Sequence, residues 1–143
     1  MEIYYLMEVL MAVQVTEKQV KEKVKKIINI FEKYNAIYTL TPMTMGYGES
    51  GHPDRLLLIA GNMVGIEVKK DKNNHHSRPE LKPKPNEVMQ KRQAKKIIDA
   101  GGTWVCIHND NLKDLVDLLA QNTENGMEGF TQADKEQIIK LIG

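Results

Sequence analysis

The sequence predicts an α/β fold, in which amphipathic helices pack against a β-sheet. Three observations carry this prediction: a β-hairpin pattern over residues 56–68, apolar residues at helical spacing over 16–34 and 86–100, and a short apolar strand over 103–108. The strand at 103–108 is apolar on both faces, as in a central strand that helices cover on either side. A chain of 143 residues suits one domain with a core of its own.

The hairpin pattern organises the middle of the chain. Its two apolar runs, residues 56–60 and 63–68, are separated by Gly61-Asn62. A dipeptide of this kind favours a two-residue turn because it supplies the positive φ angles that the turn requires. We therefore take Gly61 and Asn62 as the loop residues, which sets the register of the two strands.

Three charged side chains lie at the open end of this hairpin. With Gly61 and Asn62 in the loop, Asp54 faces Lys69 and lies diagonal to Glu67. All three side chains project from the same face, because side chains alternate between the two faces of a strand. The hairpin therefore gathers two carboxylates and an ammonium group at one end.

The helices are predicted from capping signals and periodicity. A capping box from Thr16 to Gln19 starts an amphipathic helix that runs to about residue 34. The helix after the hairpin begins at residue 86 or 87 and ends at Gly101-Gly102. Its inner face is expected to carry Gln90, Ala94, Ile97 and Ile98. The other predicted elements are a strand at 37–40, a loop at 41–52, a helix after the cap at 109–111 and a last helix from Thr131.

Charge is distributed unevenly along the chain. The net charge is +1, yet residues 69–96 hold ten basic and three acidic side chains. A basic centre in an otherwise acidic chain points to an anionic partner, although a solvated lysine-rich surface would have the same composition. Within it, residues 70–86 are expected to form an extended surface loop. We expect His75 and His76 to be exposed to solvent or to contact phosphate, because no partner ligands stand at a zinc-like spacing.

The single cysteine, Cys106, excludes an intrachain disulfide and zinc sites of the paired-cysteine type. It favours a reducing, intracellular setting, and we expect a cytoplasmic protein. Residues 1–15 are apolar but too short to span a membrane, and they lack the flanks of a signal peptide. No membrane partner is therefore expected, and this N-terminal arm has no assigned role.

The charged cluster has the chemistry of a divalent-metal site for phosphodiester hydrolysis. Mg²⁺ prefers oxygen ligands, which the carboxylates of Asp54 and Glu67 and the carbonyl of Val68 provide. Lys69 is placed to orient or deprotonate the attacking water, or to hold a phosphate. Glu17 and Gln90 can reach the same place from their helices. The alternative interpretation is a surface ion-pair cluster, but unpaired carboxylates at the end of an apolar hairpin are unfavourable.

These residues also carry a family resemblance. Pro53-Asp54 followed by Glu67-Val68-Lys69 resembles the signature of the PD-(D/E)xK nuclease superfamily, and more narrowly its VRR-NUC (virus-type replication-repair nuclease) branch. The likeness covers about residues 16–119. The loop at 70–86 departs from it, being longer and more basic than expected.

The resemblance implies a restriction-endonuclease-like αβββαβ core, with a mixed sheet between helices, in a nuclease domain spanning residues 16–119 of a single-domain chain. Residues 120–143 would then form a C-terminal helical extension. It implies DNA cleavage that depends on Mg²⁺, or Mn²⁺ in its place, with Asp54, Glu67 and the Val68 carbonyl as metal ligands. Lys69 would act on the attacking water. Gln90 and Glu17 would complete the site, with Glu22 as an alternative to Glu17.

Members of this branch act as homodimers on branched DNA, including four-way junctions, in phage or bacterial replication and repair. The resemblance implies the same partners here. The alternatives are a non-catalytic DNA-binding module, an RNA nuclease, and a restriction-type subunit that needs a partner. The side chains expected to contact DNA are Lys70, Lys72, Arg78, Lys82, Lys84, Lys91 and Arg92.

Overall fold

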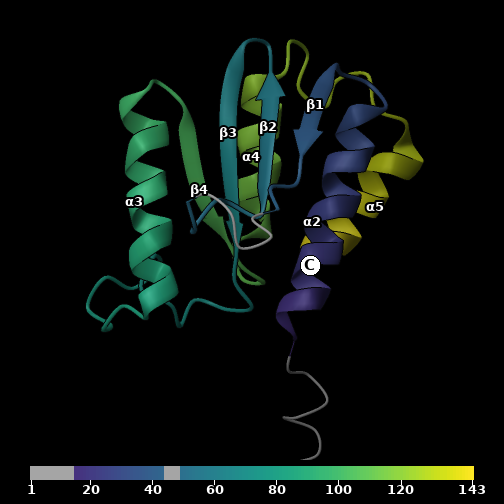
Figure 1. Ribbon diagram of the computed structural model, residues 1–143. Coiled ribbons are helices and arrows are strands. Elements are labelled where there is room, and N and C mark those ends of the chain that lie inside the picture. The colour runs from purple at the N-terminus through teal and green to yellow at the C-terminus, as the bar shows by residue number, and fades with distance from the viewer. Residues whose placement is uncertain (1–14, 44–48) are drawn as a thin grey trace, which may run out of the picture.

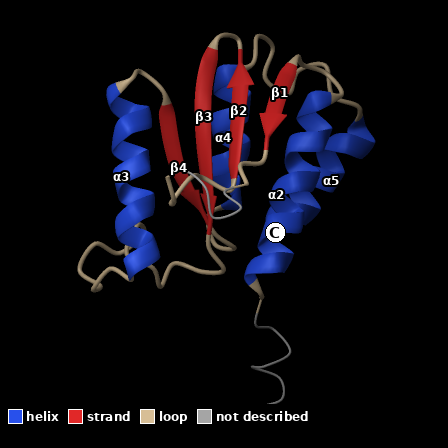
Figure 2. Cartoon of the chain, viewed as in Figure 1, coloured by secondary structure: helices blue, strands red, loops and turns tan. Residues whose placement is uncertain are grey.

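The computed structural model describes residues 15–43 and 49–143, which form a mixed four-stranded sheet flanked by helices (Figures 1 and 2). The strands lie in the order β1-β2-β3-β4, and only β3 and β4 run parallel. The α/β fold and the αβββαβ order of the core are thus confirmed. The elements are α2 (Glu17–Glu32), β1 (Ile37–Leu40), β2 (Arg55–Ile59), β3 (Asn62–Val68), α3 (Pro85–Asp99), β4 (Thr103–Ile107), α4 (Leu112–Asn122) and α5 (Gln132–Ile142).

The two faces of the sheet have different partners. Val64, Ile66 and Val68 of β3 are fully buried in one apolar cluster that also contains residues of α2, α4 and α5. The alternate residues face α3, where a Cβ added to Gly65 would lie 3.1 Å from Ile97 of α3. Because side chains alternate along β3, the residues that enter the apolar core and the residues that face α3 lie on opposite faces of the strand. Glu67 and Lys69 belong to the α3 face.

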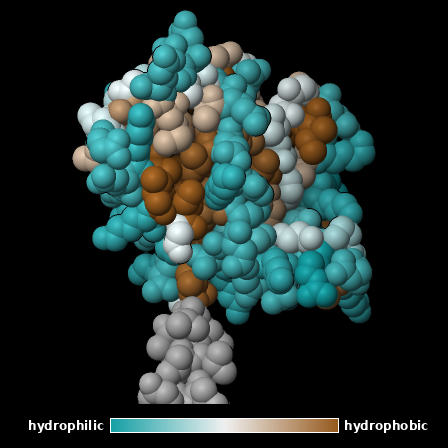
Figure 3. All heavy atoms as spheres, turned by 180° about the vertical axis from the view of Figure 1, so that it is seen from behind, coloured by the Kyte–Doolittle hydropathy of each residue, from teal (hydrophilic) through white to brown (hydrophobic). Residues whose placement is uncertain are grey.

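The C-terminal helix α5 packs against α2 and α4. Tyr34, which follows α2, stacks on Phe130 with ring centroids 4.2 Å apart, and its hydroxyl group bonds to Asp134. Lys33 adds an ion pair to Asp134. Seen from behind, the surface of the molecule shows hydrophobic residues in its middle (Figure 3). Ile139 of α5 is an exposed apolar side chain.

The hairpin forms, but its loop differs from the expected one. Ala60 and Gly61 are the turn residues, with φ angles of 49° and 81°, and Asn62 pairs with Ile59. The expected loop of Gly61 and Asn62 is therefore wrong by one residue. The turn needs two consecutive positive φ angles, and Ala60 accepts the first of them although alanine rarely does.

Strand β4 lies at an edge of the four-stranded sheet of the described residues, where it pairs with β3 alone. The expected central strand is thus wrong, and Trp104, Val105 and Cys106 are only half-buried. The apolar character of both faces has another cause. Val105 packs against the core cluster, while Trp104 packs on the α3 side against His76.

Helix α3 starts with Pro85 and ends before Gly101, whose φ is 94°. Its buried side chains are Glu87, Gln93 and Ala94, so the expected inner position of Ile98 is wrong. Ile98 is 54% exposed. The inner stripe is shifted because Gly65 and Gly102 leave room for Ile97 against the sheet.

The loop between β3 and α3 is folded on itself rather than extended. Asn74 is buried and bonds to the Asp71 carbonyl and to Ser77. Glu87 is also buried, and its carboxylate accepts hydrogen bonds from the backbone N–H groups of His75 and Lys84. The expectation that His75 and His76 are exposed to solvent is therefore wrong; both are half-buried.

Predictions for residues 1–14 and for part of the loop at 41–52 fall on residues outside the described ranges. No helix of the described residues is long and apolar enough to cross a membrane.

Candidate active site

Asp54 and Glu67 lie opposite each other at the open end of the hairpin. Arg55 pairs with Ile66, so the antiparallel register continued by one residue sets Asp54 directly across from Glu67. Opposed side chains of this kind have Cβ atoms about 4.5–5.5 Å apart. The corrected turn thus brings the two carboxylates closer than the diagonal relationship that the sequence predicted.

The end of β3 fixes the Asp54 carboxylate. Asp54 Oδ2 accepts a 2.7 Å hydrogen bond from the Val68 N–H. The N–H and C=O of one residue point to the same side of an extended strand, so the Val68 carbonyl is also directed toward Asp54. Neighbouring Lys69 points its N–H the other way, to the carbonyl of Ile107 on β4.

Glu67 is a buried carboxyl group with an unpaired oxygen. Its side chain faces α3, the residue is 4% exposed, and Oε2 is buried with no hydrogen-bond partner in the described part of the chain. Burial, reinforced by the negative charge of Asp54, raises the pKa of Glu67 to about 9. Nearby Lys69 lowers this pKa without offsetting the burial. The ionised form of the Glu67 carboxyl group would therefore need a further positive charge close to it.

Lys21 also belongs to the cluster, although the sequence pattern did not predict it. Its Nζ lies 3.3 Å from Asp54 Oδ1 and 3.3 Å from Glu17 Oε2. Burial lowers the pKa of Lys21, but the charges of Asp54 and Glu17 outweigh that effect and the pKa is raised. The available signal was the spacing from Glu17, since residues four apart are neighbours on a helix.

Glu17 and Lys69 line a shared polar hollow of about 210 Å³. Lys70 and Lys84 line it too, together with Asp71 and Glu87. Glu17 is close enough for its charge to raise the pKa of Glu67. The start of helix α2 and the segment after β3 therefore meet at this hollow; the role of Glu17 in the site stays a prediction.

Gln90 lies on the α3 side but is directed elsewhere. Its Oε1 is 2.9 Å from Nε2 of His76, so the amide supports the folded loop. The expected approach of Gln90 to the two carboxylates is not among the contacts of the described residues. Burial lowers the pKa of His76; the hydrogen bond to Gln90 opposes this effect, and the positive charge of Lys69 adds to it.

Gly51 sets the approach of the segment that carries Asp54. Its φ is 83°, and a Cβ there would lie 2.4 Å from the backbone carbon of Met89 in α3. Only glycine accepts both the conformation and the contact. The chain therefore enters β2 pressed against α3, with Pro53 buried.

The basic side chains expected to contact DNA fall into three groups, at the polar hollow, on α3 and on the loop before α3. Lys70 and Lys84 line the polar hollow beside Lys69, while Lys91 and Arg92 are exposed on α3. Arg78 is engaged by Glu80 and Asn73, which leaves it less available than the others. Lys72 and Lys82 are exposed on the loop.

The residues present fit a divalent cation in one specific way. Within residues 15–43 and 49–143, no group of three His, Cys, Asp or Glu side chains is arranged to hold a metal ion. The donor set is instead two carboxylates and a carbonyl, from Asp54, Glu67 and Val68. Mg²⁺ commonly takes one or two protein carboxylates and fills its other positions with water or phosphate. The unpaired Oε2 of Glu67 is the oxygen that such an ion would satisfy.

Comparison with known proteins adds little beyond the fold. No family model matches the chain, and no curated protein matches it. One similar solved structure is described as a VRR_NUC domain; it is 24% identical, covers 69% of this chain and 95% of its own, and has a TM-score of 0.48. That description names the family that the sequence resembles. At this level of similarity, the function has to be argued from the residues of the site.

Proposed function

We propose that this chain is a metal-dependent endonuclease that hydrolyses phosphodiester bonds in DNA. The observation that carries the proposal is the buried Glu67, which has an unpaired oxygen, a pKa raised to about 9 and Asp54 directly opposite. A surface ion-pair cluster would not bury an unpaired carboxyl oxygen. The combination is typical of sites tuned for chemistry.

Each residue of the cluster has a defined role in the proposal. Asp54, Glu67 and the Val68 carbonyl hold Mg²⁺, or Mn²⁺ in its place; when bound, the ion supplies positive charge to the phosphoryl oxygens and acidity to water. The Val68 N–H fixes the rotamer of Asp54. Lys69 orients the attacking water or takes its proton. Gln90 positions His76 through their hydrogen bond and has no direct contact with the reacting atoms.

Glu17 and Lys21 form the helix side of the site. Lys21 balances the charges of Asp54 and Glu17, and of these two carboxylates Glu17 lines the polar hollow. Phosphate oxygens entering this hollow would meet Lys69, Lys70 and Lys84, which line it. Lys72, Lys82, Lys91 and Arg92 extend the basic surface, with Arg78 in a lesser role. Such a surface binds a polyanion in a salt-dependent way.

The finer features of the proposal follow the resemblance. We expect a homodimer that selects branched DNA, including four-way junctions, and that acts in phage or bacterial replication and repair in the cytoplasm. Residues 16–119 would form the nuclease core, residues 120–143 a helical extension, and residues 1–15 an arm. The basic segment of the chain, residues 69–96, supports DNA as the partner but does not select its structure.

A cleavage panel tests the proposal. Junction, duplex and single-stranded DNA and RNA are incubated with the protein in Mg²⁺, in Mn²⁺ and in EDTA. We expect cleavage of DNA only with a metal, and loss of cleavage in Lys69→Ala. Lys113→Ala is the matched control, because Lys113 is an exposed lysine on α4, across the sheet from α3. Full activity of Lys69→Ala would overturn the proposal. Salt-sensitive binding without cleavage would identify a DNA-binding module instead, and selective cleavage of RNA would identify an RNA nuclease.

A further inference from the structure

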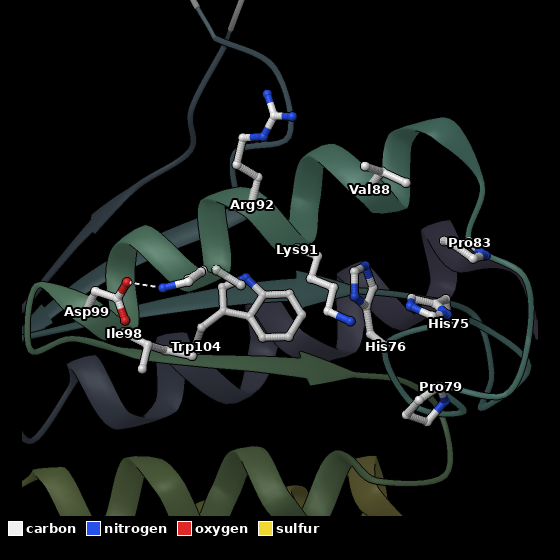
Figure 4. Close-up of a pocket in the computed structure, with 12 residues that line it drawn as sticks. His75, His76, Pro79, Pro83, Val88, Lys91, Arg92, Ile98, Asp99 and Trp104 are labelled. Carbon is white, nitrogen blue, oxygen red and sulfur yellow. Dashed lines mark hydrogen bonds and ion pairs between the residues drawn. The ribbon is translucent and has the colours of Figure 1, made fainter.

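A second hollow, of about 670 Å³, lies beside the edge strand β4 (Figure 4). Its walls are the outer face of α3 and the loop that carries His75 and His76. Trp104 of β4 lines it and occupies the middle of the view in Figure 4. Its lining shares no residue with that of the polar hollow, so the two hollows are separate.

The wall around Trp104 is aromatic and apolar. The indole Nε1 is buried, so the exposed part of this half-buried side chain is carbon. The His76 ring meets the indole edge-on, with centroids 5.1 Å apart at 66°, and Gln90 fixes His76 through its Nε2. Figure 4 shows Ile98 on the other side of the indole. The result is a preformed apolar surface with an aromatic ring at its centre.

The rim of the hollow is cationic. Lys91, Arg92 and Lys95 of α3 are exposed and line it, and the acid on this rim, Asp99, is paired with Lys95. Figure 4 shows the Lys91 side chain extending toward the space between the indole and His76. An apolar peptide carries no negative charge that could pair with this excess of positive charge. An aromatic base that carries a phosphate matches both the ring and the rim.

The hollow also adjoins the candidate active site. His75, which lines this hollow beside His76, donates its backbone N–H to Glu87, and Glu87 lines the polar hollow together with Lys69. A DNA strand whose phosphate contacts Lys69 would therefore place a flanking nucleotide near His76. Bases inside a duplex are stacked and cannot enter a side pocket without leaving the stack.

We propose that the hollow formed by Trp104, His76 and Ile98 binds an unpaired nucleobase of the strand next to the scissile phosphate. This inference rests on the proposed function and names the feature of the substrate that the site selects. An unpaired nucleotide is present at branches, gaps and ends, so the hollow would direct cleavage to such places. Stacking on Trp104 would supply the affinity, and Lys91 and Arg92 would contact the flanking phosphates.

The sole tryptophan of the chain, Trp104, reports on the hollow directly. The wild-type protein in EDTA, which prevents metal-dependent cleavage, is titrated with a short oligothymidylate and with an abasic strand of equal length and charge. We expect the oligothymidylate to quench the fluorescence and to bind about tenfold more tightly than the abasic strand, as stacking of one base on an aromatic ring allows. Equal affinity for the two strands would overturn the proposal.

Three variants, followed by the anisotropy of labelled strands, locate the effect. Trp104→Leu removes the ring, and Ile98→Glu places a carboxylate in the hollow at an already exposed position. Ile139→Glu is the matched control, because Ile139 is 64% exposed on α5. Only the first two variants should lose the preference for the strand with bases. A preference that survives Ile98→Glu would contradict the assignment, even if Trp104→Leu failed to fold.

Failure of this proposal is distinguishable from failure of the nuclease proposal. Metal-dependent cleavage without a preference for bases would remove the nucleobase site and leave the nuclease standing. A preference for bases without cleavage in Mg²⁺ or Mn²⁺ would remove the nuclease and leave a base-binding module.

Discussion

The Val68 N–H donates a 2.7 Å hydrogen bond to Asp54 Oδ2, and this contact joins the two strands just beyond their last paired residues. It turns the Asp54 carboxylate toward the end of β3, where the Val68 carbonyl is directed to the same side. Asp54 Oδ1 remains for Lys21, at 3.3 Å. The hydrogen bond is thus structural, and the charge of Asp54 is what the proposed chemistry uses.

Asp54→Asn separates these two roles. The amide oxygen of asparagine can still accept from the Val68 N–H, while the negative charge is lost. We expect the melting temperature to change little and metal-dependent cleavage to fall by at least about 100-fold, in line with removal of one electrostatic partner of a transition state. Mn²⁺ binding, measured by calorimetry, should weaken in parallel. Asp117→Asn, at an exposed position of α4, is the control and should match the wild type in both measurements.

Glu67→Gln should change how stability depends on pH. The pKa of Glu67 is about 9 in the fold and about 4.3 in an unfolded chain. The folded state therefore holds a proton that the unfolded state releases between these values. The metal-free wild type should lose stability as pH rises from 5 to 9, by up to about 1.4 kcal/mol per pH unit. Because glutamine does not titrate, the free energy of unfolding of the variant should rise relative to that of the wild type as the pH increases.

Urea unfolding in EDTA at several pH values checks this expectation. Below pH 4 the difference in the free energy of unfolding between variant and wild type should be constant. Added Mn²⁺ should stabilise the wild type at pH 8 and leave Glu67→Gln unchanged, because binding to the native state alone stabilises it. Parallel pH profiles for the two proteins would contradict the raised pKa of the buried Glu67 carboxyl group.

Local signals in the sequence were sufficient for most of the fold and for the central residues of the site. The capping box at Thr16 and Gln19 is present, and Asp54, Glu67 and Lys69 occupy one end of the sheet. These features depend on neighbours along the chain or across a hairpin. A register error of one residue in the loop left Asp54 and Glu67 on the same face, because moving the turn by one residue shifts the pairing by two.

Features that depend on distant packing were not predictable in the same way. Whether β4 is central or at an edge depends on which strands pair, and the amino-acid composition of β4 is compatible with both positions. Gln90 and Gln93 lie on one helix with similar chemistry, and it is Gln93 that is buried, where its amide donates to Glu49 and to the Ser50 carbonyl, more than 40 residues away in the chain. His76 looked exposed because the folding of its loop depends on Glu87, twelve residues from His75.

Lys21→Gln should strengthen metal binding. A positive charge 3.3 Å from Asp54 Oδ1 opposes a divalent cation at the same carboxylate. Because the group is partly exposed, screening limits the effect, and we expect Mn²⁺ affinity to rise about three- to tenfold at low salt and less at high salt. Lys25→Gln, an exposed lysine on the same helix, should leave the affinity unchanged. An unchanged or weaker affinity in Lys21→Gln would show that no cation binds beside Asp54.

Gly51→Ala should destabilise the protein and disturb the site. Gly61→Ala should destabilise the protein only slightly and leave the site intact. Both glycines have positive φ, 83° and 81°, but a Cβ at Gly51 would lie 2.4 Å from Met89 backbone and one at Gly61 would meet nothing within 4 Å. Gly61→Ala therefore carries the conformational strain alone, about 1 kcal/mol. Gly51→Ala adds a clash with the backbone of α3 that no side-chain rotation relieves, and we expect a total loss of stability of about 3 kcal/mol from urea unfolding.

Since residue 51 guides the chain to Asp54, the folded fraction of Gly51→Ala should also bind Mn²⁺ more weakly, while Gly61→Ala binds it as the wild type does. Equal losses of stability in the two variants would mean that strain at φ, rather than the contact with α3, is what Gly51 provides.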